Sequence, residues 1–162
     1  MGTLFITAND RKLLGIHFVS DCPKDNENYL TKVVKQELLE YFQKKRTYFS
    51  RFPLSLSSAE EKIFDKILAI PYGMTSTYFT LAKELGNVND VKEIAKIIQN
   101  NPYLILIPCH RVLGKNKSLY NYQAGVKIKE ELLILFVSKL LKTLRYRETH
   151  ELDKKEGINY GE

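Results

Sequence analysis

Two short runs rich in β-forming residues, 3–9 and 12–19, open the chain, with a polar turn between them. This pattern predicts a β-hairpin. From Asn28 the apolar residues change to a helical spacing of three and four, which predicts a helix of about four turns that covers the hairpin. We expect residues 48–56 to add an edge strand that ends at Pro53. The apolar face of the helix is formed by Leu30, Val33, Val34, Leu38, Tyr41 and Phe42.

The second half of the chain has the pattern of a series of helices. Ser58 and Glu61 fit a capping box at the start of a helix that runs to about residue 70. A second helix is expected over 76–85, and a third should begin at Asn89 as its cap. Two helices joined by a short turn with a glycine match the helix-turn-helix pattern, which also occurs in proteins that bind no nucleic acid. A last helix is expected over 126–145.

These patterns predict the α/β class, of the α+β type, with three segments. Residues 1–55 form a small supporting domain of sheet and helix. Residues 56–146 form a mainly helical domain with a helix-turn-helix, similar to a winged helix, and 147–162 are a polar tail. A linker of leucine and serine at 54–58 separates the first two.

Composition limits the expected cellular location more than it limits the function. The 162 residues are 44% hydrophobic, which is enough for a core, and the net charge of +6 permits a polyanionic partner without indicating one. The first residues lack the pattern of a signal peptide, and no stretch has the length of a membrane span. We therefore expect no membrane association. Because Cys22 and Cys109 are the only cysteines, we expect a reducing cell interior, which is the cytoplasm, or the nucleus in a eukaryote.

Candidate chemistry is concentrated after the apolar run 104–107. Pro108 ends this buried run, and Cys109, His110 and Arg111 follow it at once. A thiolate is a nucleophile, and a histidine and a fixed positive charge beside it can favour the ionised form. Most free cysteines, however, are small buried hydrophobic residues. The Cys-His pair alone therefore leaves both interpretations open.

The wider pattern resembles the O6-alkylguanine-DNA alkyltransferases. Residues 107–112, Ile-Pro-Cys-His-Arg-Val, are similar to the active-site signature of that family, and the similarity continues without a gap from about residue 63 to 133. It includes Ile70-Pro71-Tyr72-Gly73, Thr75-Ser76-Thr77-Tyr78, Asn101-Pro102, Asn121-Tyr122, Gly125, Lys129 and Leu132-Leu133.

The resemblance implies repair by direct damage reversal. A flipped alkylguanine would lose its alkyl group to Cys109 in one irreversible transfer, with His110 and Tyr78 assisting. The implied partner is double-stranded DNA that contains O6-alkylguanine, and the implied protein is a monomer without a metal or cofactor.

The resemblance also implies a binding role for further residues. Tyr122 would lie against the flipped base, in a pocket wall that includes Gln123. Asn101 matches a hinge, and Lys92 stands where the family has an arginine that replaces the extruded nucleotide. Arg111 and Val112, from the signature, complete the predicted binding set.

Two departures from the family keep a second interpretation open. Phe136 stands where the family has a glutamate that orients the histidine, and Lys92 lacks the planar guanidinium of arginine. A damage sensor of the alkyltransferase-like type would bind the lesion without repair, although such proteins lack the cysteine. A helix-turn-helix regulator with an incidental thiol would not explain residues 108–111.

Overall fold

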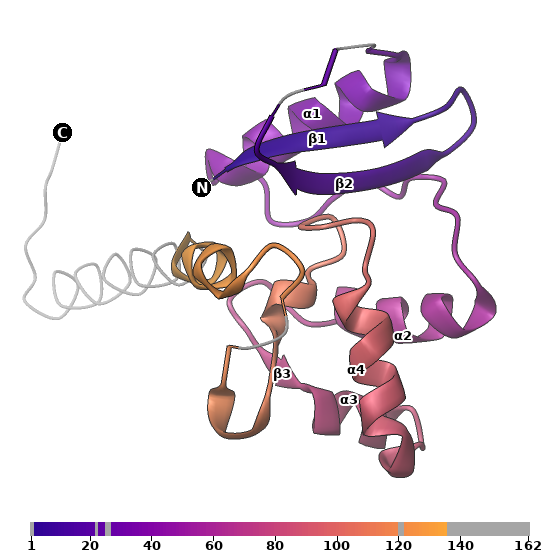
Figure 1. The fold of residues 1–162 in the computed structure, drawn as a ribbon, viewed down its shortest axis with the longest axis vertical. Helices are drawn as coiled ribbons and strands as arrows, with labels where there is room; N and C mark the ends of the chain where they lie inside the picture. The colour runs from indigo at the N-terminus through magenta and orange to yellow at the C-terminus, as the bar shows by residue number, and fades with distance from the viewer. Residues whose placement is uncertain (1, 22, 25–26, 120–121, 136–162) are drawn as a thin grey trace, which may run out of the picture.

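A computed structural model describes residues 2–21, 23–24, 27–119 and 122–135. The hairpin and the first helix form one layer, and the remaining helices form a second layer below it in the view of Figure 1. The mixed α+β class and the helix-turn-helix are both present. The segment that carries Cys109 runs between these layers.

The predicted hairpin and the helix beside it are confirmed. Strands β1 (Thr3–Ala8) and β2 (Leu13–Val19) pair antiparallel, with a register shift near Ala8. Helix α1 (Tyr29–Phe42) begins at a capping box in which Asn28 and Thr31 exchange hydrogen bonds. Its buried residues include Val34, Leu38 and Tyr41, three of the six predicted positions on its apolar face.

The predicted edge strand over 48–56 is wrong. Leu54 makes only an isolated parallel bridge to Leu13, whose amide donates to the carbonyl of Pro53 at 2.9 Å. Two helix starts also differ. Helix α2 (Ser58–Leu68) is capped by Ser57 with Glu60, one residue before the predicted pair. Asn89 lies inside a 3₁₀ turn, η1 (Val88–Asp90), and does not cap the helix that follows.

The helix-turn-helix consists of α3 (Tyr78–Glu84) and α4 (Val91–Gln99), which pack together (Figure 1). Helix α3 begins two residues later than predicted, because Ser76 and Thr77 form a short strand, β3. Strand β3 pairs parallel with β4 (Val112–Leu113), directly after the Cys109 turn, and a 3₁₀ turn η3 (Lys115–Lys117) follows β4.

Two contacts join the layers next to the Cys109 segment. The amide of Ile16 in β2 donates to the carbonyl of Pro102 at 2.8 Å, and the amide of Leu104 donates to the carbonyl of Ile16 at 3.2 Å. The buried Tyr103 side chain extends this junction, because its hydroxyl accepts from the Ser55 amide at 2.9 Å. The same hydroxyl lies 3.3 Å from the carbonyl oxygens of Leu13 and Ser55.

The last helix is described over residues 126–135 only. Phe136, the rest of the helix predicted to residue 145 and the tail 147–162 lie outside the described residues, as does Asn121 of the sequence signature. The predicted domain boundaries stay predictions. Within the described part of the chain, no helix has both the length and the apolar character needed to cross a membrane.

The Tyr103 junction gives a first prediction. Tyr103→Phe removes the hydroxyl from three backbone groups and should lower the free energy of unfolding by about 1–3 kcal/mol, the cost of unsatisfied buried polar groups. Chemical denaturation measures this loss. Tyr48→Phe is the matched control, since Tyr48 is 75% exposed and should change stability little. Equal effects of both variants would contradict the role of the junction.

Candidate active site

Cys109 begins a 3₁₀ turn, η2 (Cys109–Arg111), immediately after Pro108. Its amide donates to the carbonyl of Ile107 at 2.8 Å, and the residue is only 4% exposed. The turn begins where the apolar segment predicted from the sequence ends. The thiol is therefore part of the buried core, at the start of a hydrogen-bonded turn.

The side chain of Asn101 makes a hydrogen bond that fixes the position of the Cys109 thiol. Its fully buried amide nitrogen, Nδ2, lies 3.1 Å from Cys109 Sγ and donates to the carbonyl of Ile107 at 3.0 Å. Its Oδ1 accepts from the amide of Tyr103 at 2.9 Å. One side chain thus holds both ends of the segment that leads to the cysteine.

The backbone between these ends turns sharply. Ile105 has φ +73°, a left-handed conformation that is unusual for a β-branched residue. The amide of Ile107 donates to the carbonyl of Tyr103 at 3.0 Å across this turn. A conformation of this kind costs on the order of 1–3 kcal/mol and persists only where the surroundings impose it.

Lys129 is a buried cation near the thiol. It lies in the last helix, is fully buried, and donates from Nζ to the carbonyl of Val112 at 2.7 Å. Burial lowers its pKa to about 8, and the Cys109 thiolate opposes that shift.

The family signature in the sequence includes Lys129 but assigns it no role. Its position three residues before the buried Leu132, on the helix face that packs inward, is the signal that could have identified it.

The electrostatics of Cys109 favour the thiol. Burial raises its pKa to about 11, and the Asn101 hydrogen bond and the Lys129 charge act in the opposite direction. Desolvation of the charged sulfur therefore outweighs these two groups together with the backbone hydrogen bonds of Cys109 and His110. A thiolate in the resting protein is a minor species near neutral pH.

His110 lies next to Cys109 in η2 and is fully buried. Burial, followed by the charges of Arg111 and Lys129, lowers its pKa to about 3. The imidazole is thus neutral at physiological pH. A neutral imidazole retains a nitrogen that can accept a proton, but this environment makes it a weak base.

Two tyrosines interact electrostatically with the thiol. Tyr78, at the first position of α3, is 8% exposed, and burial and then the Cys109 charge raise its pKa to about 12. Burial and the same thiolate also raise the pKa of Tyr122. Within the described residues the Tyr122 hydroxyl has no hydrogen-bond partner. Both phenols are therefore un-ionised near neutral pH.

The other predicted binding residues lie in two different environments. Arg111 is buried, donates from Nη1 to the carbonyl of Ile70 at 2.9 Å, and lies 5.5 Å from the ring centroid of Tyr72. Val112 is buried in β4, whereas Lys92 in the first turn of α4 and Gln123 are exposed. The fold thus brings Cys109, His110, Tyr78, Tyr122 and Asn101 together and leaves Lys92 and Gln123 at the surface. The binding roles stay predictions.

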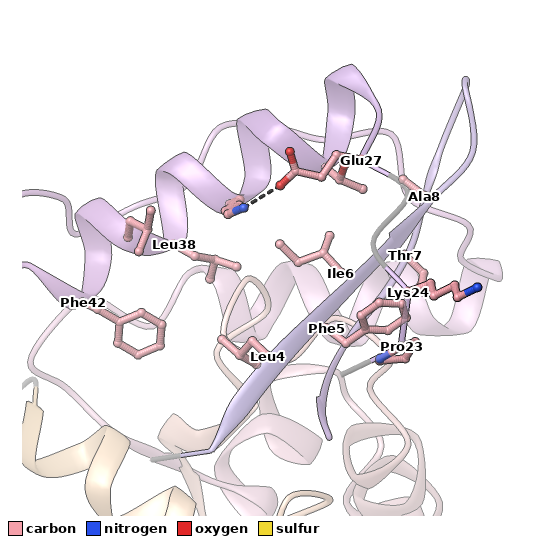
Figure 2. Close-up of a pocket in the computed structure, with 13 residues that line it drawn as sticks. Leu4, Phe5, Ile6, Thr7, Ala8, Pro23, Lys24, Glu27, Leu38 and Phe42 are labelled. Atoms are coloured by element: carbon pink, nitrogen blue, oxygen red, sulfur yellow. Dashed lines mark hydrogen bonds and ion pairs between the residues drawn. The ribbon is translucent and has the colours of Figure 1, made fainter. Parts of the chain in front are cut away.

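A separate hollow of about 440 Å³ lies between β1 and α1, away from the predicted site residues (Figure 2). Leu4, Ile6, Leu38 and Phe42 line it, and Glu27 forms an ion pair with Lys35 at its border. Its lining is mainly apolar, and the described residues that line it include neither a cysteine nor a histidine. Among the described residues, histidine, cysteine and acidic side chains nowhere gather in a group of three that could bind a metal.

Comparison with protein families matches both parts of the chain. Residues 58–135 match a family described as 6-O-methylguanine DNA methyltransferase, DNA binding domain. Residues 1–56 match the ribonuclease-like domain of the same methyltransferase.

Individual relatives agree with this match. A methylated-DNA–protein-cysteine methyltransferase of Metallosphaera sedula is 30% identical over 139 residues, which cover 83% of this chain and 86% of the relative. A probable enzyme of the same name from Acanthamoeba polyphaga mimivirus is 38% identical over 98 residues, 59% of this chain, and the match spans 65% of that relative. The crystal structure of Mycobacterium tuberculosis OGT in complex with DNA matches with a TM-score of 0.73 at 25% identity, over 83% of this chain and 86% of that one.

The buried imidazole predicts a pH-dependent stability. An unfolded chain binds a proton at His110 below about pH 6.5, whereas the folded chain does so only near pH 3. The free energy of unfolding should therefore fall as pH decreases from 6.5 to 5, by up to about 1.4 kcal/mol per pH unit. Denaturant titrations at several pH values should give a flatter profile for His110→Gln. His17→Gln serves as the control and should keep the slope that His110 contributes; an unchanged profile for His110→Gln would refute the assignment.

Proposed function

This chain belongs to the 6-O-methylguanine DNA methyltransferase family, and we propose that it repairs DNA by transferring the alkyl group of O6-alkylguanine to Cys109. The observation that supports this most directly is the 3.1 Å contact between Asn101 Nδ2 and Cys109 Sγ. It holds one sulfur atom in a fixed direction, near two buried, un-ionised tyrosines, Tyr78 and Tyr122. A nucleophile with a defined approach is what a one-step displacement needs.

The reaction is a single substitution at carbon. The Cys109 sulfur attacks the alkyl carbon, the new S–C bond forms, and the C–O6 bond breaks with its electrons going to the guanine oxygen. The thiol proton is lost, and guanine gains one proton. The thioether product cannot revert under ordinary conditions, so each protein molecule acts once. A polarisable sulfur needs no cofactor for this attack.

Proton transfer involves Tyr78. Its pKa of about 12 keeps the phenol protonated, so that it can donate a hydrogen bond or a proton to the departing guanine. Lys129 stabilises the thiolate that forms when the Cys109 thiol loses its proton, because its buried ammonium group interacts electrostatically with the sulfur. His110 can accept the thiol proton only weakly.

The burial of Cys109 favours base flipping. At 4% exposure the sulfur cannot meet a base that stays stacked inside a duplex, so the guanine must leave the helix to react. Tyr122 is suited to lie against the flipped ring, and stacking on an aromatic side chain is worth about 1–3 kcal/mol per base. Exposed Lys92 and Lys96 on α4 provide charge for contacts to the duplex.

One observation favours a second candidate, a sensor that binds alkylated DNA without repair. The pKa of Cys109 is raised to about 11, so little thiolate is present near neutral pH. Such a sensor would flip the lesion and leave it unchanged. The presence of a positioned cysteine argues against this role, and the next experiment separates the two.

Intact-mass spectrometry tests the transfer. After incubation with a duplex that contains one O6-methylguanine, the protein should gain one methyl group, which peptide mapping should assign to Cys109. Cys109→Ala should gain nothing.

The second cysteine offers a matched control. Cys22→Ser should be methylated like the unmodified protein. Selective binding of the duplex with no gain in mass would reject the enzyme and leave the sensor.

A further prediction concerns the cation. Lys129→Met should slow methyl transfer by roughly tenfold for each unit by which the Cys109 pKa rises. The difference from the unmodified protein should be largest below pH 8 and shrink above it, where Lys129 itself loses its charge. Single-turnover rates across this range measure the effect.

Lys127→Met is the control, because Lys127 is exposed on the same helix. Thermal unfolding of both variants checks that the fold is kept. A rate ratio that does not change with pH would contradict an electrostatic role for Lys129.

A further inference from the structure

An exposed phenylalanine stands directly beside the buried Tyr78. Phe79 is 60% exposed, whereas Tyr78 is 8% exposed. Single exposed apolar residues are common and mean little by themselves. The position of Phe79 is informative, because α3 begins with one buried ring that interacts electrostatically with Cys109, followed by one exposed ring.

The sheet pairing determines what lies beside Phe79. Thr77 is the register partner of Leu113 in a parallel pair, so the chain leaves β3 and β4 at the same edge. From β3 it enters α3 with Tyr78 and Phe79, and from β4 it enters η3 (Figure 1). Lys115 and Lys117 are exposed in η3. The exposed ring therefore lies at an edge that also carries two lysines.

The surface formed by α3, η1, α4 and η3 has a charge that suits a polyanionic partner. The exposed charged residues of α3, η1, α4 and η3 are five lysines and three acidic residues. The excess is positive, and lysine contacts to phosphates supply the sequence-independent part of DNA affinity. The lysines are Lys83, Lys92, Lys96, Lys115 and Lys117, and the acidic residues are Glu84, Asp90 and Glu93.

We propose that Phe79 makes an apolar contact with the base next to the flipped alkylguanine and so supports the opened duplex. This inference rests on the proposed function. A guanine that reaches Cys109 passes Tyr78 and leaves its neighbours without a stacking partner on one side. The exposed ring of Phe79 is the next side chain along the chain and offers an aromatic face to an unstacked base.

An apolar contact has a signature that differs from an ionic one. Removal of the ring lowers affinity at every salt concentration by the same factor. Removal of a lysine that contacts a phosphate instead reduces the salt dependence of binding by about one unit of slope. Phe79→Ala and Lys115→Ala therefore form an informative pair.

The test measures the affinity of the full chain for a duplex with one O6-methylguanine, by fluorescence anisotropy from 50 to 300 mM salt, with Cys109→Ala in every variant to prevent reaction. We expect Phe79→Ala to weaken binding by roughly tenfold with an unchanged salt slope, and Phe79→Trp to restore it. Tyr29→Ala is the matched control, since Tyr29 is an aromatic residue on α1 that is 84% exposed. It should bind like the parent.

The outcomes separate this inference from the proposed function. If the parent shows no preference for the alkylated duplex, the proposed function and this inference both fail. If the parent is selective and Phe79→Ala binds within twofold of it, only this inference fails. A weakened Phe79→Ala with a reduced salt slope also overturns it, because the lost contact would then be electrostatic. In the cysteine-containing protein, Phe79→Ala should react with iodoacetamide at the parental rate, which checks that the site is intact.

Discussion

The side chain of Asn101 is the constraint on which the site depends. It has one carbonyl oxygen and one amino group, and it uses them on the amide of Tyr103, the carbonyl of Ile107 and the sulfur of Cys109. Buried amide groups of this kind are hydrogen-bonded in folded proteins. The same bonds that remove this cost also fix the sulfur. The stability of the segment and the position of the Cys109 sulfur therefore have a common origin.

The junction between the layers extends this constraint outward. Residues 102–104 pair with β2, and Tyr103 contacts the linker at Ser55, so the small sheet holds the Cys109 segment from behind. On the other side, the pairing of β3 with β4 connects Tyr78 to the strand that follows the cysteine turn. Hairpin, linker and helix-turn-helix thus meet around one short piece of backbone. This explains how the β1–β2 sheet contributes to the geometry of the site.

Periodicity and motif were sufficient to predict α1, the hairpin and the place of Cys109, because each depends on local sequence. Because Ser57 and Ser58 are adjacent, the sequence leaves the N-cap of α2 uncertain by one residue. The hydrogen bonds with Glu60 identify Ser57 as the cap. The failed strand at 48–56 depended on pairing that sequence patterns do not encode. The burial of Lys129 was not predicted, because a lysine on a helix usually indicates a solvent-exposed face, and only its spacing from Leu132 indicates otherwise.

The left-handed turn at Ile105 has a consequence for protein design. A β-branched residue does not choose this conformation on its own, so tertiary contacts of the intact fold hold it there. A peptide with the sequence of residues 101–112, grafted onto another scaffold, would relax at this point and lose the alignment between amide and sulfur. A transplanted version would need glycine or asparagine at position 105, together with a replacement for the β2 edge. The conformation of the Cys109 segment is thus a property of the whole architecture, and its sequence alone would not reproduce it on another scaffold.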